Sequence, residues 1–232
     1  MQEVARWISI LGHPFVTATA MVLAGASGRG TAAAARNIAV FVAIAIVPIA
    51  ILMIRQVRRG AWEHVDASNR RERPALYVVG ISALVVWFGY TALTAPRSPL
   101  MRELIVTVTM LVLCAILTRW IKVSLHVTIA AFTATALVLY RSPIGWAIAV
   151  LVPLLIWSRL RLRRHKPIEV GLGLVIGICA GLALHYPVAV RDQRARSSAN
   201  AFVRGEDASE VERIGGADGD DPPVRRLLAD LA

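Results

Sequence analysis

Apolar residues in this chain gather into seven long runs separated by short polar stretches. The runs are Trp7–Ala26, Asn37–Ile54, Ala75–Ala95, Leu104–Ile121, Ser124–Tyr140, Ile144–Trp157 and Pro167–Tyr186. Most reach or approach the ~20 apolar residues that a helix needs to cross a hydrocarbon core. A helix also satisfies its backbone hydrogen bonds within its own segment, as a lipid surrounding requires. The pattern predicts an all-α fold, a polytopic transmembrane bundle of about seven segments with six as the fallback.

Three local features of these runs predict how the helices turn and pack. Only Arg141, Ser142 and Pro143 separate the fifth run from the sixth, which predicts a tight hairpin of two helices. The first run contains Gly12-His13-Pro14, which predicts a helix that is kinked or partly re-entrant. The last run carries glycines at 171, 173, 177 and 181, a spacing that indicates close helix packing.

Composition excludes a water-soluble globule and divides the chain into two parts. Of the 232 residues 56% are hydrophobic and 18% charged, with a mean hydropathy of +0.60. A soluble domain usually carries about 25% charged residues. From Arg191 onward the chain is rich in Ala, Gly, Asp, Glu and Arg. We therefore expect a transmembrane helical domain over residues 1–190 and a soluble, flexible tail over 191–232.

The formal net charge of +11 raises the question of nucleic acid, but the positions of the charges argue against it. The Lys and Arg residues of the first 190 positions lie in short loops between apolar runs, where anionic lipid or a phosphorylated substrate is the better partner. With seven crossings, fourteen of the 26 Lys and Arg residues fall on one side of the membrane and five in the short loops of the other. The positive-inside rule then predicts a multi-pass cell-membrane protein with the first side in the cytoplasm.

Three polar clusters open apolar runs and are candidates for one site. They are residues 66–74 before the third run, 122–126 at the start of the fifth, and 158–169 between the sixth and seventh. Two crossings separate each cluster from the next, so all three are expected at the same membrane face. Polar residues at membrane depth are costly, and their convergence favours a functional site.

The third cluster has a spacing suited to nucleophilic chemistry. His165 and Glu169 are four positions apart, so on a helix they share one face. A carboxylate that accepts from one imidazole nitrogen fixes the tautomer and makes the other nitrogen a nucleophile. Arg159 offers a planar donor fork for phosphate oxygens. From other helices, His126 could protonate a departing alkoxide and Arg73 could stabilise charge in the transition state.

These residues resemble the motifs of the type 2 phosphatidic acid phosphatase superfamily of membrane lipid phosphatases. That family carries K-x6-R-P, P-S-G-H and S-R-x5-H-x3-D in this order. The chain has D-x6-R-P at Asp66–Pro74, V-S-L-H at Val123–His126 and S-R-x5-H-x3-E at Ser158–Glu169. The resemblance covers roughly residues 55–186, and its third motif is the most specific.

The resemblance implies a metal-independent phosphatase without a cofactor, which hydrolyses a phosphate or diphosphate on a polyprenyl chain or a glycerolipid. His165 would be the nucleophile and form a phosphohistidine, Glu169 would orient it, and His126 would protonate the leaving group. The residues implied to bind phosphate are Arg159, Arg73, Ser124 and Ser158.

The chain also departs from the family pattern. Asp66 stands where the family has a phosphate-binding Lys, and Arg70, one helical turn further on, or Arg71 would have to restore the lost positive charge. Leu125 stands where a Gly lets the backbone approach phosphate. These differences keep open an alternative function, that of a catalytically weakened member that binds or transports phospholipid.

Three other histidines are interpreted as structural. We expect His13 and His185 to be interfacial or packing residues, and His64 to form a local polar cap with Asp66.

Overall fold

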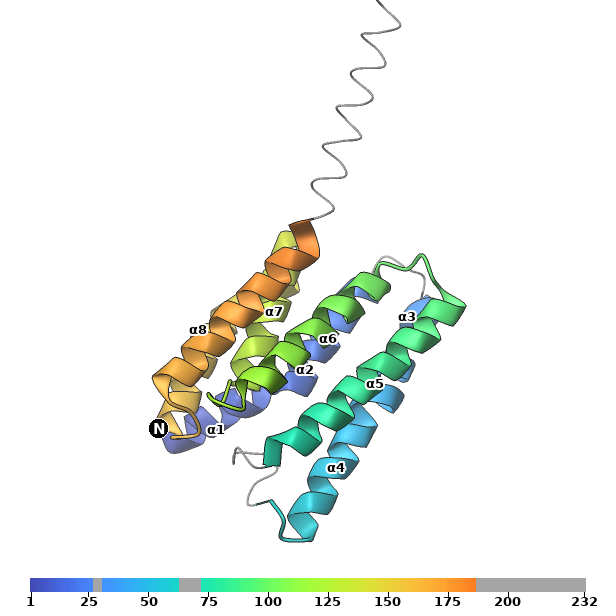
Figure 1. The fold of residues 1–232 in the computed structure, drawn as a ribbon. Coiled ribbons are helices and arrows are strands. Elements are labelled where there is room, and N and C mark those ends of the chain that lie inside the picture. Colours follow the sequence, from blue (N-terminus) through green and yellow to red (C-terminus); the bar gives the residue numbers. More distant parts are fainter. Residues whose placement is uncertain (27–30, 63–71, 187–232) are drawn as a thin grey trace, which may run out of the picture. The chain divides into compact units, whose positions relative to one another are not determined.

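The fold is described by a computed structural model that places residues 1–26, 31–62 and 72–186. Asp66, Arg70, Arg71, His64 and the tail 191–232 lie outside these residues. The helices are α1 (Gln2–Leu11), α2 (Pro14–Ala26), α3 (Thr31–Phe41), the π-helical turn η1 (Val42–Ile46), α4 (Val47–Arg58), α5 (Arg73–Thr94), α6 (Leu100–Leu117), α7 (Leu125–Leu139), α8 (Pro143–Arg161) and a last helix, Pro167–Tyr186. Figure 1 follows them from α1 in blue to the last helix in orange. No strand occurs within the described ranges.

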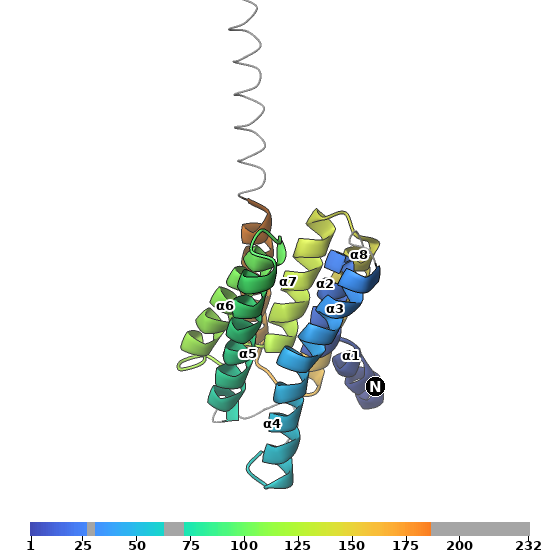
Figure 2. The ribbon, with the colours of Figure 1, turned by 90° about the vertical axis from the view of Figure 1, so that its right-hand side faces the viewer.

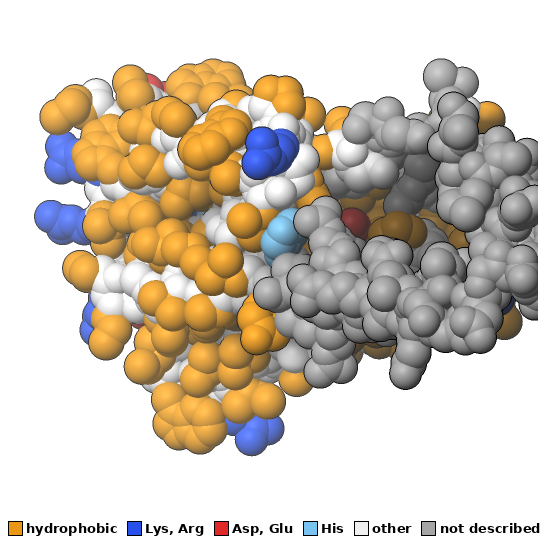
Figure 3. All heavy atoms as spheres, turned by 90° about the horizontal axis from the view of Figure 1, so that it is seen from above, with side chains coloured by type: hydrophobic (Ala, Val, Ile, Leu, Met, Phe, Trp, Pro, Cys, Tyr) orange, Lys and Arg blue, Asp and Glu red, His pale blue; other side chains and the backbone are white. Residues whose placement is uncertain are grey.

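The described helices confirm a multi-pass membrane protein. Six stretches are long and apolar enough to cross a bilayer, and α7 is a seventh, shorter apolar helix. The six are Gln2–Gly25, Ala35–Arg58, Arg73–Thr94, Leu100–Leu117, Pro143–Arg161 and Pro167–Tyr186. Many large hydrophobic side chains are exposed, among them Val78, Val86 and Val150, and Figure 3 shows hydrophobic side chains over most of the described part of the face in view.

The short helix α7 lies at the centre of the packing. It is apolar on all sides, and ten of its 15 residues are buried. Helices α2 and α8 both pack against it. A helix that is hydrophobic all round is typically a buried one. Other helices cover most of the surface of α7.

Glycines bring the last helix close to α7, as their spacing predicts. A Cβ added at Gly173 would lie 2.9 Å from the carbonyl oxygen of Ser124, and one at Gly177 would lie 2.4 Å from that of Thr128. Gly181 meets α7 in the same way one turn further on. Gly171 differs, because a Cβ there would have nothing within 4 Å. The small residues at 173, 177 and 181 therefore form the packing stripe, and Gly171 does not belong to it.

The turns follow from local sequence. Pro143 starts α8 directly after a turn in which Arg141 adopts a φ of 56°, and this closes the α7–α8 hairpin predicted from the short polar turn. The predicted interruption of the first apolar run is also present, since α1 ends at Leu11 and α2 begins at Pro14. Gly12 at this break is buried, and a Cβ there would lie 2.6 Å from the side chain of Leu155 on α8.

Helices α3, η1 and α4 form one continuous rod, which is clearest in Figure 2. The π-helical turn η1 packs against α5, and α5 packs against α6. Phe41 and Trp87 pack together where α3 meets α5, with ring centroids 5.2 Å apart. These helices and α2 and α7 enclose the apolar cavity considered below.

Candidate functional site

His165 lies between α8 and the last helix, in a setting that fixes its protonation. Its Nδ1 is 2.9 Å from Oε2 of Glu169 in the first turn of the last helix, and its side chain is almost fully buried. The same carboxylate oxygen accepts from the backbone N–H of Lys166 at 3.1 Å. A carboxylate only accepts, so Nδ1 carries a proton, and in the neutral imidazole Nε2 keeps its lone pair. The predicted His165–Glu169 pair is therefore formed, with Nε2 as the basic nitrogen.

Arg73, the first residue of α5, meets this nitrogen. Its Nη2 lies 3.4 Å from Nε2 of His165, and its Nη1 donates to the backbone oxygen of Val123. A guanidinium has donors only, so the short approach agrees with a lone pair on Nε2. Arg73 is 4% exposed. The structure thus brings together one residue from each of the three polar clusters.

The start of α7 adds a buried hydroxyl and a helix N-terminus. Ser124 is the N-cap residue of α7, fully buried, and its backbone N–H donates to the carbonyl of Glu169 at 3.1 Å. Its hydroxyl has no hydrogen-bond partner among the described residues, and neither has Nε of Arg73. Buried polar atoms without a partner are uncommon and call for an explanation. Together with the N–H groups of a first helical turn, they suit the oxygens of an anion.

Lys122 ties two of the loops together. Its Nζ donates to the carbonyl of Arg164 at 2.8 Å and lies 4.0 Å from Oε2 of Glu169. The connection before α7 is thereby fixed to the connection that carries His165. Three contacts between loops, made by Arg73, Ser124 and Lys122, agree with the expectation that the polar clusters share one end of the bundle.

His126 also lies at this end, beside a histidine that the sequence interpretation set aside. His126 is buried on α7 and lines the same cavity as Arg73. Its ring meets that of His13 edge to face, with centroids 5.1 Å apart. Nδ1 of His13 accepts from the backbone N–H of Phe15 at 3.2 Å, which assigns the proton of a neutral His13 to Nε2. The helix break before Pro14 places His13 here, so the packing contact of this histidine is with a residue of the candidate site.

Ser158 and Arg159 are buried at the end of α8, where they contact α1. The hydroxyl of Ser158 donates to the carbonyl of Ala5 at 2.5 Å, and Nη1 of Arg159 donates to Oγ of Ser9 at 2.9 Å. In this structure both predicted phosphate ligands therefore have partners on the N-terminal helix. The sequence carried a signal for this contact, because Ala5, Ser9 and Gly12 form a stripe of small residues on one side of an otherwise bulky helix.

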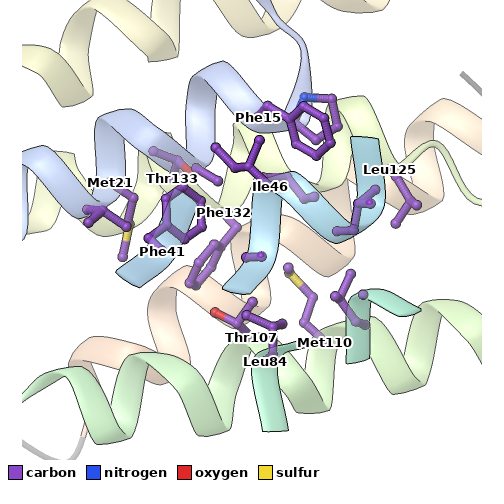
Figure 4. A pocket seen from close by; sticks show the side chains of 18 of the residues that line it. Phe15, Met21, Phe41, Ile46, Leu84, Thr107, Met110, Leu125, Phe132 and Thr133 are labelled. Carbon is purple, nitrogen blue, oxygen red and sulfur yellow. The ribbon is translucent and has the colours of Figure 1, made fainter. Parts of the chain in front are cut away.

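Leu125, in place of the family's Gly, points its side chain into the cavity (Figure 4). The predicted cation Arg70 and the anion Asp66 lie outside the described residues. Comparison of the chain with models of known families, with curated proteins and with solved structures finds no match.

Proposed function

We propose that this protein is a membrane phosphatase similar to the type 2 phosphatidic acid phosphatases. Its substrate is a lipid-linked phosphate or diphosphate, and its nucleophile is His165. The observation that carries the proposal is the arrangement of His165 between Glu169 and Arg73. One neighbour fixes the proton on Nδ1, and the other holds a cation at the nitrogen that would attack.

The proposed reaction proceeds in two steps. The lone pair of His165 Nε2 attacks phosphorus, the bond from phosphorus to the lipid oxygen breaks, and His126 gives a proton to the departing alkoxide. Water then attacks the phosphohistidine and gives a proton to His126, and inorganic phosphate leaves with Nε2 restored. Arg73 exchanges its contact with Nε2 for the phosphoryl oxygens, where its charge stabilises the transition state.

Ser124 and the N–H groups of the first turn of α7 are the proposed additional phosphate ligands. The free hydroxyl of Ser124 and the free Nε of Arg73 would then gain the partners that they lack in the described structure. His13 is proposed as a positioning residue, because its ring packs on His126 and limits the rotation of the proton donor.

The site face is proposed to lie in the cytoplasm, on the basis of charge. By the count of crossings in the sequence, four stretches fall on that side, namely residues 1–6, 55–74, 119–122 and 158–166, and they carry fourteen Lys and Arg residues. The bilayer is proposed to be the cell membrane.

Phosphate release from farnesyl phosphate in detergent tests the proposal. The native chain is expected to release phosphate and to form an acid-labile phosphoprotein, and His165→Ala is expected to do neither. His185→Ala is the matched control, since His185 lies near the far end of the last helix, beside Tyr140 and not at the site. Equal rates in the native chain and in His165→Ala would refute the proposal for this substrate.

A second candidate function is phospholipid binding or transport without hydrolysis. It is favoured by the contacts of Ser158 and Arg159 with α1 and by Leu125 at the start of α7. This function predicts that the protein binds a non-hydrolysable phosphonate lipid but releases no phosphate from the matching phosphate ester. Product analysis by mass spectrometry separates the two.

A further inference from the structure

An apolar cavity opens from the site into the bundle. Side chains of α2, η1, α4, α5, α6 and α7 line it, among them Phe15, Ile46, Leu84, Met110 and Phe132 (Figure 4). Arg73, His126 and His13 lie at one end of this lining, and Glu103 of α6 at the other. Between these ends the wall is almost wholly hydrocarbon.

The cavity extends far along α5. Its lining on this helix runs from Arg73 through Gly80 and Leu84 to Trp87. Fourteen residues of α-helix span about 21 Å, so the lining covers most of the depth of a hydrocarbon core. The buried Gly80 supplies part of the wall, and the nearest atom to a Cβ added there would be Cδ1 of Ile49, at 3.7 Å.

The rod formed by α3, η1 and α4 packs against α5 and forms another part of the cavity wall. Its α-helical structure is interrupted once, at η1. Ala45 and Ile46 of the π-helical turn η1 line the cavity. Such π-helical turns occur frequently at functional sites. Ala45 is buried and small, so it leaves space where a larger side chain would reach toward α5.

We propose that this cavity binds the apolar chain of the substrate, and that its depth selects for long chains. The inference rests on the proposed function. A phosphoryl group at Arg73 and His165 leaves the attached chain beside His126, where the cavity begins. A long chain entering there would exchange contacts with lipid for contacts with Leu76, Leu84, Met110 and Phe132. A short chain would contact only the residues nearest Arg73.

Two glycines of α5 provide a matched test. Gly80 lines the cavity about 10 Å along the helix from Arg73. Gly89 lies on the same helix, and a Cβ there would have nothing within 4 Å. Gly80→Leu puts a branched side chain into the cavity, and Gly89→Leu makes the same change outside it. Ala45→Leu narrows the cavity from the opposite wall and serves as a second blocking variant.

The measurement is KM for farnesyl phosphate and for isopentenyl phosphate, with folding checked by thermal unfolding. Gly80→Leu and Ala45→Leu should each raise KM for farnesyl phosphate by about tenfold or more, because several buried methylenes lose their contacts. KM for isopentenyl phosphate should stay within about twofold, and Gly89→Leu should change neither value. Equal effects on both substrates in folded Gly80→Leu and Ala45→Leu would overturn the inference, as would no effect on either.

Binding of a farnesyl phosphonate separates this inference from the proposed function. If the native chain binds the phosphonate but releases no phosphate from the ester, the hydrolytic function fails. The inference about the cavity then stands or falls with the Kd. A Kd raised by Gly80→Leu and unchanged by Gly89→Leu supports the cavity, and a Kd unchanged by both refutes it.

Discussion

Nη2 of Arg73 and Nε2 of His165 lie 3.4 Å apart although the residues are 92 positions apart in the chain. The contact requires a lone pair on Nε2, and the hydrogen bond from Nδ1 to Glu169 leaves one there. Arg73 therefore lies on the side of Nε2 where the phosphorus atom of a substrate would have to approach. In the proposed reaction, substrate binding would move the guanidinium from Nε2 to a phosphoryl oxygen, so Arg73 would contact His165 before the substrate binds and the reacting group afterwards.

Replacing Arg73 by Lys should lower kcat/KM for farnesyl phosphate by roughly 10²–10³-fold, because a point charge cannot contact Val123 and the phosphoryl group as a planar fork can. The control is Arg102→Lys, since Arg102 donates to Ala183 at the opposite end of the bundle. Steady-state kinetics in detergent make the comparison. Similar losses in both variants would show that the loss at Arg73 is not specific to the site.

Replacing Glu169 by Gln should lower kcat by about 10²–10⁴-fold with a smaller change in KM, because the amide no longer fixes the proton on Nδ1 by charge. Glu169→Asp keeps the charge and should retain more activity than the Gln variant. Rapid-quench measurement of phosphohistidine formation locates the loss. A normal rate of phosphohistidine formation in Glu169→Gln would contradict an orienting role.

Replacing His13 by Phe should slow hydrolysis only where the leaving group needs a proton. We expect kcat for farnesyl phosphate to fall by about 10–100-fold, less than the ~10²–10⁴-fold that a general acid contributes, because His126 itself remains. Hydrolysis of p-nitrophenyl phosphate should change little, because nitrophenolate leaves without a proton.

His13→Gln, which can still accept from Phe15, should recover part of the loss. A purely structural role would instead reduce the rates for both substrates in the same proportion.

Replacing Gly177 by Ala should destabilise the bundle by about 1–3 kcal/mol, because the added Cβ would overlap the backbone of α7 at Thr128. Gly171→Ala on the same helix should be neutral or slightly stabilising, since the space there is open and Ala favours the helix. Thermal unfolding in one detergent compares the two. Equal shifts in Tm would contradict the close packing described here.

Cysteine labelling tests the orientation in the membrane. Cys114 is buried and Cys179 exposed, so Cys179→Ala provides the background. Arg59→Cys, after α4, should be protected from an impermeant maleimide in intact cells, and Arg97→Cys, after α5, should react. Both positions are exposed. The reverse labelling pattern would place the site on the outer face.

Much of the local structure could be predicted because each feature depends on neighbouring residues. Run length predicted the membrane helices, and the polar turn at Arg141 predicted the hairpin. The glycine series predicted a packed helix face, which includes positions 173, 177 and 181 but not 171. The i,i+4 spacing placed His165 beside Glu169. The helix break before Pro14 was visible too, but its consequence for His13 was not, because no local pattern tells which helix a residue will face.

The amino-acid sequence by itself determined which segments are helices, where they stop, and that polar residues gather at one end. Tertiary structure decided that Arg73 meets His165, that His13 packs on His126, that α1 binds Ser158 and Arg159, and that a cavity runs beside α5. The reason is that lipid, unlike water, accepts an apolar surface on any side of a helix. Helices such as α7 and α8 are apolar on every side, so hydrophobic patterning cannot specify their neighbours, and shape complementarity together with a few buried hydrogen bonds selects them.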